Sequence, residues 1–298
     1  MTNRRSLVRG AALTAALVLV AAACSSGDDA TADTSAPSPA GETTFPVDSF
    51  AILANADIGV GPSRILFGIG DPTGRRLGSP EDEVSIAVAH IDRLDDVQTV
   101  PGVFTWIVEG AFGLYRAEFD FDIPGAWVAF VMPEAGDPLP PVGFNVLADT
   151  FAPAVGEPAP APKTPTLADL PFEEITTDGD PDPRFYELSL DEAIGNGRKT
   201  VVVFATPAFC VSAACGPLLD ITKGLAPLYP GVDFVHVEVY TNLTDPDFAP
   251  IPANLAPSVL SDWWNLPSEP WVFVVDEAGI VQARFEGVMA TDELDAEL

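Results

Sequence analysis

The chain has 298 residues, of which 44 are Asp or Glu and 14 are Lys or Arg, so its formal net charge at pH 7 is −30. Such an acidic protein is repelled by the phosphates of DNA and RNA, and we therefore expect no nucleic-acid function. Hydrophobic residues make up 47% of the chain, which is enough for packed cores and excludes a wholly disordered protein. With three cysteines and two histidines, the chain has few residues for nucleophilic, redox or metal chemistry.

The first 24 residues have the pattern of an export signal. Arg4, Arg5 and Arg9 precede an apolar run, residues 11–23, which at about 13 residues is too short to span a bilayer as a helix. The run ends in small residues followed by Cys24 and a polar tail, and this resembles the lipobox of bacterial lipoproteins, with Ala at position 21 where that family usually has Leu. The resemblance implies a signal peptide over 1–23 and a lipid on Cys24. It predicts a protein anchored by that lipid to the extracytoplasmic side of the cell membrane.

Composition divides the remainder of the chain. Residues 24–44 are rich in Ser, Thr, Ala, Pro, Gly and Asp and predict a disordered tether. Residues 152–183 are dense in proline, which is incompatible with a long helix or a central strand, and predict an interdomain linker. The expected folded domains are therefore 45–151 and 184–298.

The first of these domains is predicted to be all-β. Residues 115–123 alternate apolar and polar side chains with the period of a half-buried strand, and Pro124-Gly125 marks a turn. Several short strands at this spacing indicate a β-sandwich. The run from Gly113 to Val128 resembles small immunoglobulin-like domains of exported bacterial proteins. His90 has no Cys or Met near it in sequence, and we expect it to have a packing or surface role and not to bind a metal.

The second domain alternates helices and strands. Its expected elements are a short helix at 188–194, a buried strand at 200–204, a cysteine-containing loop at 205–215, a helix at 217–229, a strand at 232–240, a helical turn or short helix at 258–265, a strand at 271–275, a turn at 276–279, a strand at 280–286 and a terminal helix from Thr291.

The cysteine spacing constrains where the pair can lie. If Cys24 carries a lipid, Cys210 and Cys215 remain, and outside the cytoplasm a nearby pair is expected to be oxidised or to cycle. On a regular helix, positions five apart lie about 140° apart around the axis. A disulfide needs Cα atoms within about 7 Å. Either Cys210 lies in the loop before the helix, or the first turn of the helix is irregular.

Three pieces of this domain resemble the thioredoxin fold, namely Val201 to Cys210, Cys215-Gly216-Pro217, and Ser268 to Gly279. The resemblance implies an α/β thioredoxin-like domain whose Cys210–Cys215 disulfide is catalytic. It also implies a cis Glu269–Pro270 peptide beside the disulfide, and it places Pro270, Glu269 and Pro207 in the substrate groove. No cofactor is implied.

The chain departs from that family in ways that leave the mechanism open. Four residues separate the cysteines, where thioredoxins have two, and the first strand has Val where thioredoxins carry a buried acid. The distance from the strand favours Cys210 as nucleophile. Proximity to the helix N-terminus, which lowers a thiol pKa, favours Cys215.

The sequence thus predicts a membrane-anchored extracytoplasmic thiol–disulfide oxidoreductase that acts on exported protein thiols or exchanges electrons with a membrane redox partner. The alternative is a non-catalytic exported binding module in which the disulfide is structural. A copper carrier is a weaker alternative because His236 lies in a strand and not in a later loop. A peroxiredoxin-like role is weaker too, since Pro207 occupies the position where that family needs Thr.

Overall fold

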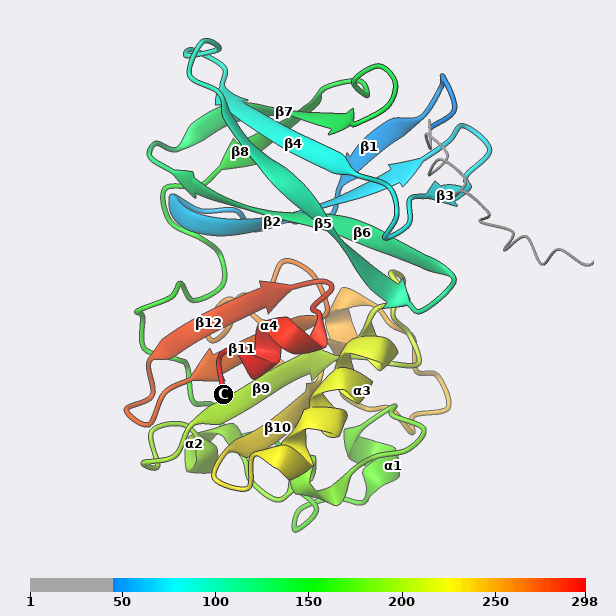
Figure 1. Ribbon diagram of the computed structural model, residues 1–298. Coiled ribbons are helices and arrows are strands. Elements are labelled where there is room, and N and C mark those ends of the chain that lie inside the picture. The colour runs from blue at the N-terminus through cyan, green and yellow to red at the C-terminus, as the bar shows by residue number, and fades with distance from the viewer. Residues whose placement is uncertain (1–44) are drawn as a thin grey trace, which may run out of the picture. The chain divides into compact units, whose positions relative to one another are not determined.

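The structure is a computed structural model and describes residues 45–298. The expected signal peptide, Cys24 and the tether lie outside the described residues. The described chain is organised around two β-sheets, and both belong to one compact unit (Figure 1). No helix between residues 45 and 298 is long and apolar enough to cross a membrane.

The first sheet is formed by strands that bury alternate side chains. In β6 (Phe112–Phe121), Tyr115, Phe119 and Phe121 are buried while their neighbours are less buried or exposed. This period-2 burial gives the sheet one apolar face, and the expected all-β character is confirmed. The immunoglobulin-like arrangement stays a prediction. The other strands are β1 (Phe50–Leu53), β2 (Gly61–Gly70), β3 (Arg76–Leu77), β4 (Val84–His90), β5 (Gln98–Val108), β7 (Gly125–Pro133) and β8 (Val142–Val146).

All strand pairs of this sheet are antiparallel. Within the described chain the order is β1-β2-β6-β5-β4-β7-β8, with β3 paired to β2. The sheet curls over its own core, so that β4, β7 and β8 lie opposite β2 and β6 (Figure 1). Tyr115, Phe121 and Trp127 pack in this core, where the rings of Phe121 and Trp127 meet edge to face at 4.8 Å.

The second sheet has the order β10-β9-β11-β12. Its strands are β9 (Thr200–Ala205), β10 (Asp233–Glu238), β11 (Trp271–Val275) and β12 (Val281–Glu286). β9 and β10 are parallel, whereas β11 pairs antiparallel with both β9 and β12. β9 and β11 are buried on both faces, as their continuous apolar sequences predict.

The helices around this sheet are short. α3 (Cys215–Leu225) is the longest, and it continues as the 3-10 turn η2 (Ala226–Leu228), so the expected helix at 217–229 is confirmed with a start two residues earlier. At 258–265, where a helical turn or a short helix was expected, the structure has the 3-10 turn η4 (Pro257–Val259) followed by non-helical turns. The remaining helical elements are α1 (Phe172–Ile175), η1 (Pro183–Tyr186), α2 (Leu190–Ala193), η3 (Pro252–Asn254) and α4 (Thr291–Asp295).

The segment 152–183 lies against the second sheet. The N–H of Gly156 donates to the carbonyl of Val281, and the N–H of Val281 donates to the carbonyl of Glu157, so the segment covers part of the β12 edge. Further along, Leu167, Leu170 and Phe172 pack against the core beside α3. The prolines between these contacts cannot donate hydrogen bonds, which confines the segment to the edge of the sheet. Its role as the boundary between two domains stays a prediction.

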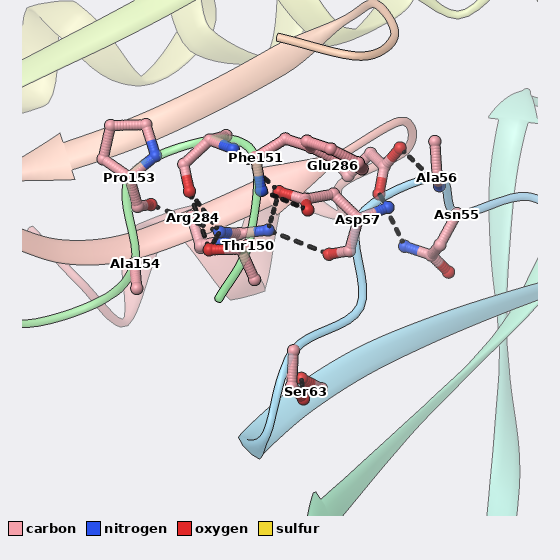
Figure 2. A network of polar contacts seen from close by, with 12 residues as sticks. Asn55, Ala56, Asp57, Ser63, Thr150, Phe151, Pro153, Ala154, Arg284 and Glu286 are labelled. Carbon is pink, nitrogen blue, oxygen red and sulfur yellow. Dashed lines mark hydrogen bonds and ion pairs between the residues drawn. The ribbon is translucent and has the colours of Figure 1, made fainter. Parts of the chain in front are cut away.

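A buried ion pair joins the two sheets (Figure 2). Arg284 of β12 donates to the carboxylate of Asp57, with Nη2 2.7 Å from Oδ2. The Asp57 side chain is fully buried and also accepts the N–H groups of Phe151 and Ala152. Next to this pair, the Glu286 carboxylate accepts the N–H of Ala56 at 2.8 Å. A charge buried this deeply is tolerated because every neighbouring donor is directed at it.

We predict that Arg284→Leu lowers the free energy of unfolding by about 3 kcal/mol, because it leaves the Asp57 carboxylate buried without its partner. The matched control is Arg93→Leu, since Arg93 pairs with Asp122 at 2.6 Å on an exposed part of the first sheet. That variant should lose less than about 1 kcal/mol. Urea unfolding of both variants measures the difference. Equal losses would contradict the assigned importance of the Asp57 pair.

Candidate functional site

The two cysteines are brought together by the loop between β9 and α3. Cys215 is the first residue of α3, and Cys210 lies five residues earlier in the loop. A disulfide joins them, with their Cα atoms 6.0 Å apart, within the range that the bond requires. The ring between them closes through a left-handed residue, Ala213, whose φ is 62°. Of the two arrangements left open by the spacing, the structure therefore has Cys210 in the loop before the helix.

The two sulfurs of this ring have different surroundings. Cys215 is fully buried, while Cys210 is only half-buried. The N–H of Cys215 donates to the sulfur of Cys210 at 3.3 Å, and the hydroxyl of Ser212 lies 3.3 Å from the same sulfur. A thiolate at Cys210 would receive both hydrogen bonds, which favours the charged form. The accessible sulfur is thus also the one with donors directed at it.

The Glu269–Pro270 peptide is cis, which confirms the expectation from the sequence. Pro270 comes directly before β11, whose first residue, Trp271, is paired with Phe204 near the end of β9. Because β9 leads into the cysteine loop, this register brings the cis peptide to the same end of the sheet as the disulfide. Glu269 and Ser268 line one cavity together with Ser212 of the disulfide ring. Pro207 is half-buried in the loop and is not among the residues that line this cavity.

Glu269 has an unusual electrostatic environment. Burial, and to a smaller extent the charge of the nearby Glu238 carboxylate, together raise the pKa of its carboxyl from 4.5 to about 7. One of its oxygens, Oε2, is buried and has no hydrogen-bond partner among the described residues. A carboxyl with a pKa near 7 can both donate and accept a proton at neutral pH.

A second buried acid, Glu238, was missed by reasoning from the sequence. It is the last residue of β10 and is paired with Ala205, the last residue of β9. Its Oε2 accepts the N–H and the hydroxyl of Thr177, both at 2.8 Å, and burial raises the pKa of its carboxyl. In the sequence, Glu238 is one polar position of an alternating strand. Nothing there shows that both faces of that strand are covered.

His236 is a structural residue of β10. Its Nε2 lies 3.1 Å from the carbonyl oxygen of Ala205, which can only accept, so Nε2 carries the proton. Its Nδ1 then accepts from the hydroxyl of Tyr186 at 2.7 Å. Burial lowers the pKa of the imidazole from 6.5 to about 4, and both ring nitrogens are occupied by the protein. Neither is available as a ligand for a copper ion.

Comparison with known proteins gives little further information. No family model matches the chain, and no curated protein sequence matches it. Among solved structures, the chain is similar to a protein provisionally described as a thiol:disulfide interchange protein DsbE from Chlorobium tepidum, with 17% sequence identity and a TM-score of 0.34. The match covers 49% of this chain and 94% of that chain. A likeness at this level establishes neither fold nor function.

We predict that Glu269→Gln changes how stability depends on pH. The raised pKa of Glu269 means that the folded state favours the neutral carboxyl, so its contribution is present below about pH 4.5 and is lost as pH rises through about 7. Relative to the parent, Glu269→Gln should therefore gain on the order of 1 kcal/mol in unfolding free energy between pH 5 and pH 8, after allowance for partial exposure. Urea unfolding at the two pH values measures this, with the exposed Glu277→Gln as control. Parallel changes in both variants would contradict the assigned environment of Glu269.

Proposed function

We propose that this chain is an extracytoplasmic thiol–disulfide oxidoreductase in which Cys210 exchanges with substrate thiols and Cys215 resolves the mixed disulfide. The observation that carries the proposal is the unequal pair, a half-buried Cys210 bonded to a fully buried Cys215 at the first turn of α3. Sheet order and connectivity support a thioredoxin-like domain, since α3 follows β9 and a cis proline precedes β11. A purely structural bridge would not require this combination.

The exchange reaction follows from the positions of the two sulfurs. A substrate thiolate attacks the sulfur of Cys210, a new S–S bond forms, and the Cys210–Cys215 bond breaks with its electron pair remaining on Cys215. N–H groups at the start of α3 stabilise the leaving thiolate. A second substrate thiol then displaces Cys210, so that two substrate thiols are oxidised to a disulfide and the protein pair is reduced. The reverse sequence reduces a substrate disulfide, and the relative potentials set the direction.

In this scheme, carboxyl groups outside β9 accept and donate the protons. Glu269 lines the cavity beside the disulfide ring, and its pKa near 7 suits a group that takes a proton from an incoming thiol and returns it to a leaving thiolate. Glu238 lies at the end of the neighbouring strand, and its charge contributes to that raised pKa. This arrangement would replace the buried acid that the first strand of the domain lacks.

The cellular location of the protein is proposed from residues 1–24 alone. Their resemblance to a lipoprotein signal supports a lipid on Cys24 and an anchor on the extracytoplasmic side of the cell membrane. A tether over 24–44 would then hold the two sheets near the membrane surface. Partners in that compartment would be exported protein thiols or a membrane redox protein that recycles the pair.

A second candidate is a binding module in which the disulfide is structural. Ala214 of the disulfide ring packs in an apolar cluster with Leu66, Ile107 and Val288, which would protect the bond from attack on that side. Structural disulfides have potentials below about −300 mV, whereas exchangers lie between about −270 and −120 mV. The two candidates therefore differ in a measurable quantity.

We predict a midpoint potential between about −270 and −120 mV for the Cys210–Cys215 pair. The experiment is a glutathione redox titration of the chain carrying Cys24→Ser, which leaves this pair as its only thiols. Thiols are trapped and counted by mass at each ratio of reduced to oxidised glutathione. A midpoint below about −300 mV would replace the oxidoreductase with the binding module.

We also predict that only Cys210 forms mixed disulfides rapidly. Cys215→Ser should trap a glutathione adduct on Cys210, because that sulfur is accessible and receives two hydrogen bonds. Cys210→Ser should form the adduct at least about tenfold more slowly, since the remaining thiol is fully buried. Mass spectrometry after timed reaction with oxidised glutathione measures both. Faster reaction of the Cys210→Ser variant would assign the nucleophile to Cys215.

A further inference from the structure

A cavity of about 350 Å3 lies between the first sheet and the disulfide ring. Ser212 and Ala214 of the ring and Glu269 before the cis proline form one wall, while Ile52 of β1 and Leu114 of β6 contribute to the other. The turn between β5 and β6 reaches toward the loop that precedes α3 (Figure 1). The volume is at the small end of the range for ligand sites. It suits a few side chains of a peptide better than a large cofactor.

The wall from the first sheet is apolar although it is partly open to solvent. Phe50 and Ile52 are 36% and 52% exposed, and they alternate along β1 with Ala51, which packs in the core of the first sheet. Two large apolar side chains on the same side of an edge strand, both lining one cavity, are costly to leave in water. An apolar group in the cavity would remove that cost.

The same wall carries a cation that the protein does not neutralise. Arg76 lies on β3 and lines the cavity, and its guanidinium stacks over the ring of Phe112 at 4.0 Å. It has no ion-pair partner among residues 45–298, whereas the adjacent Arg75 is paired with Asp71 at 3.2 Å. In a chain of net charge −30, an unpaired arginine at the rim of an apolar cavity is complementary to a carboxylate.

The carboxylates that share the cavity do not provide that partner. Glu286 already accepts the hydroxyl of Ser268 at 2.6 Å and the N–H of Ala56 at 2.8 Å. Glu269 belongs to the opposite wall, beside the disulfide ring. The first sheet therefore offers an apolar surface and a positive charge across the cavity from Ser212, whose hydroxyl lies 3.3 Å from the sulfur of Cys210, although neither cysteine lines the cavity itself.

We propose that this cavity selects the substrates of the disulfide, and that they are peptides in which an apolar side chain and a carboxylate flank the reacting cysteine. The apolar side chain lies against Ile52 and its neighbours, and the carboxylate pairs with Arg76. The peptide thiolate forms a bond to the sulfur of Cys210, and Cys215 leaves with the electron pair of the broken bond. This assignment rests on the proposed function, and it makes the first sheet the specificity-determining part of the protein.

The test compares rates of reduction of the oxidised Cys24→Ser chain by short capped peptides with a central cysteine. One peptide has Leu and Glu beside the cysteine, a second has Leu and Gln, and a third has Gly and Gln. Glutathione serves as a fourth thiol. The rate at which each peptide reduces the protein is divided by the rate at which the same peptide reacts with oxidised glutathione, which removes differences in intrinsic thiol reactivity. We expect Leu to give about a tenfold advantage over Gly, equivalent to about 1.4 kcal/mol. Glu should give about a twofold to fivefold advantage over Gln.

Two variants with matched controls assign these preferences to the cavity. Ile52→Ser should reduce the advantage of Leu to about twofold, while Val103→Ser, which removes an apolar side chain of similar exposure on β5, should leave it unchanged. Arg76→Gln should abolish the advantage of Glu, while Arg184→Gln, outside the cavity, should not. The midpoint potential and the rate of exchange with glutathione should be unchanged in the two control variants, Val103→Ser and Arg184→Gln.

The outcomes separate this inference from the function on which it rests. Normal exchange with glutathione, together with equal normalised rates for the three peptides, would overturn the substrate assignment and leave the oxidoreductase intact. An equal loss of the preference for Leu in Ile52→Ser and Val103→Ser would also overturn the substrate assignment. Failure of the disulfide to exchange with glutathione or any peptide would overturn the proposed function and the substrate assignment together.

Discussion

The buried ion pair between Asp57 and Arg284 is the interaction on which the arrangement of the described chain depends. Asp57 follows β1 of the first sheet, Arg284 lies within β12 of the second, and the carboxylate has no exposed surface. Removing two charges from water is costly. Here that cost is offset by the five hydrogen bonds that Arg284 donates, and by two backbone N–H groups that donate to the Asp57 carboxylate. Arg64 and Arg116 of the first sheet also pair with the buried Glu293, so several ion pairs hold the two sheets against each other.

The acidic side chains near the disulfide come from elements other than β9, the strand that leads to Cys210. β9 is apolar on both faces and delivers Cys210 to the end of the sheet, but it contains no acid. Its parallel neighbour β10 ends at Glu238, and the segment before β11 contributes Glu269. Glu238 is buried and Glu269 is half-buried, and this burial raises the pKa of each carboxyl. In the proposed exchange, proton transfer would depend on residues distant in sequence, which the strand pairing brings to one end of the sheet.

The first sheet gains a role from its contact with this site. Its core, around Tyr115 and Phe121, is self-contained and needs no second domain to bury it. Leu66 and Ile107, by contrast, lie outside that core and pack against Ala214 of the disulfide ring. A sheet that served only as a spacer would present a polar face there. The apolar contact and the adjoining cavity place the first sheet beside the disulfide ring, as the proposed role in substrate selection requires.

Reasoning from the sequence went furthest where the physical cause was local. The alternation of residues 115–123, the apolar run of β9, the start of α4 and the cis Glu269–Pro270 peptide were all predictable, because side-chain period, chain termination signals and a recognisable motif lie within a few residues of each other. The helical turn expected at 258–265 forms as the 3-10 turn η4 followed by further turns, and it does not lengthen into a helix before the left-handed Asn265. Tertiary structure alone decided which cysteine is the more exposed, that Glu238 is buried at the end of β10, and that Arg76 and Ser212 line one cavity. Those properties depend on burial and on contacts between segments up to about 200 residues apart, which no local pattern in the sequence encodes.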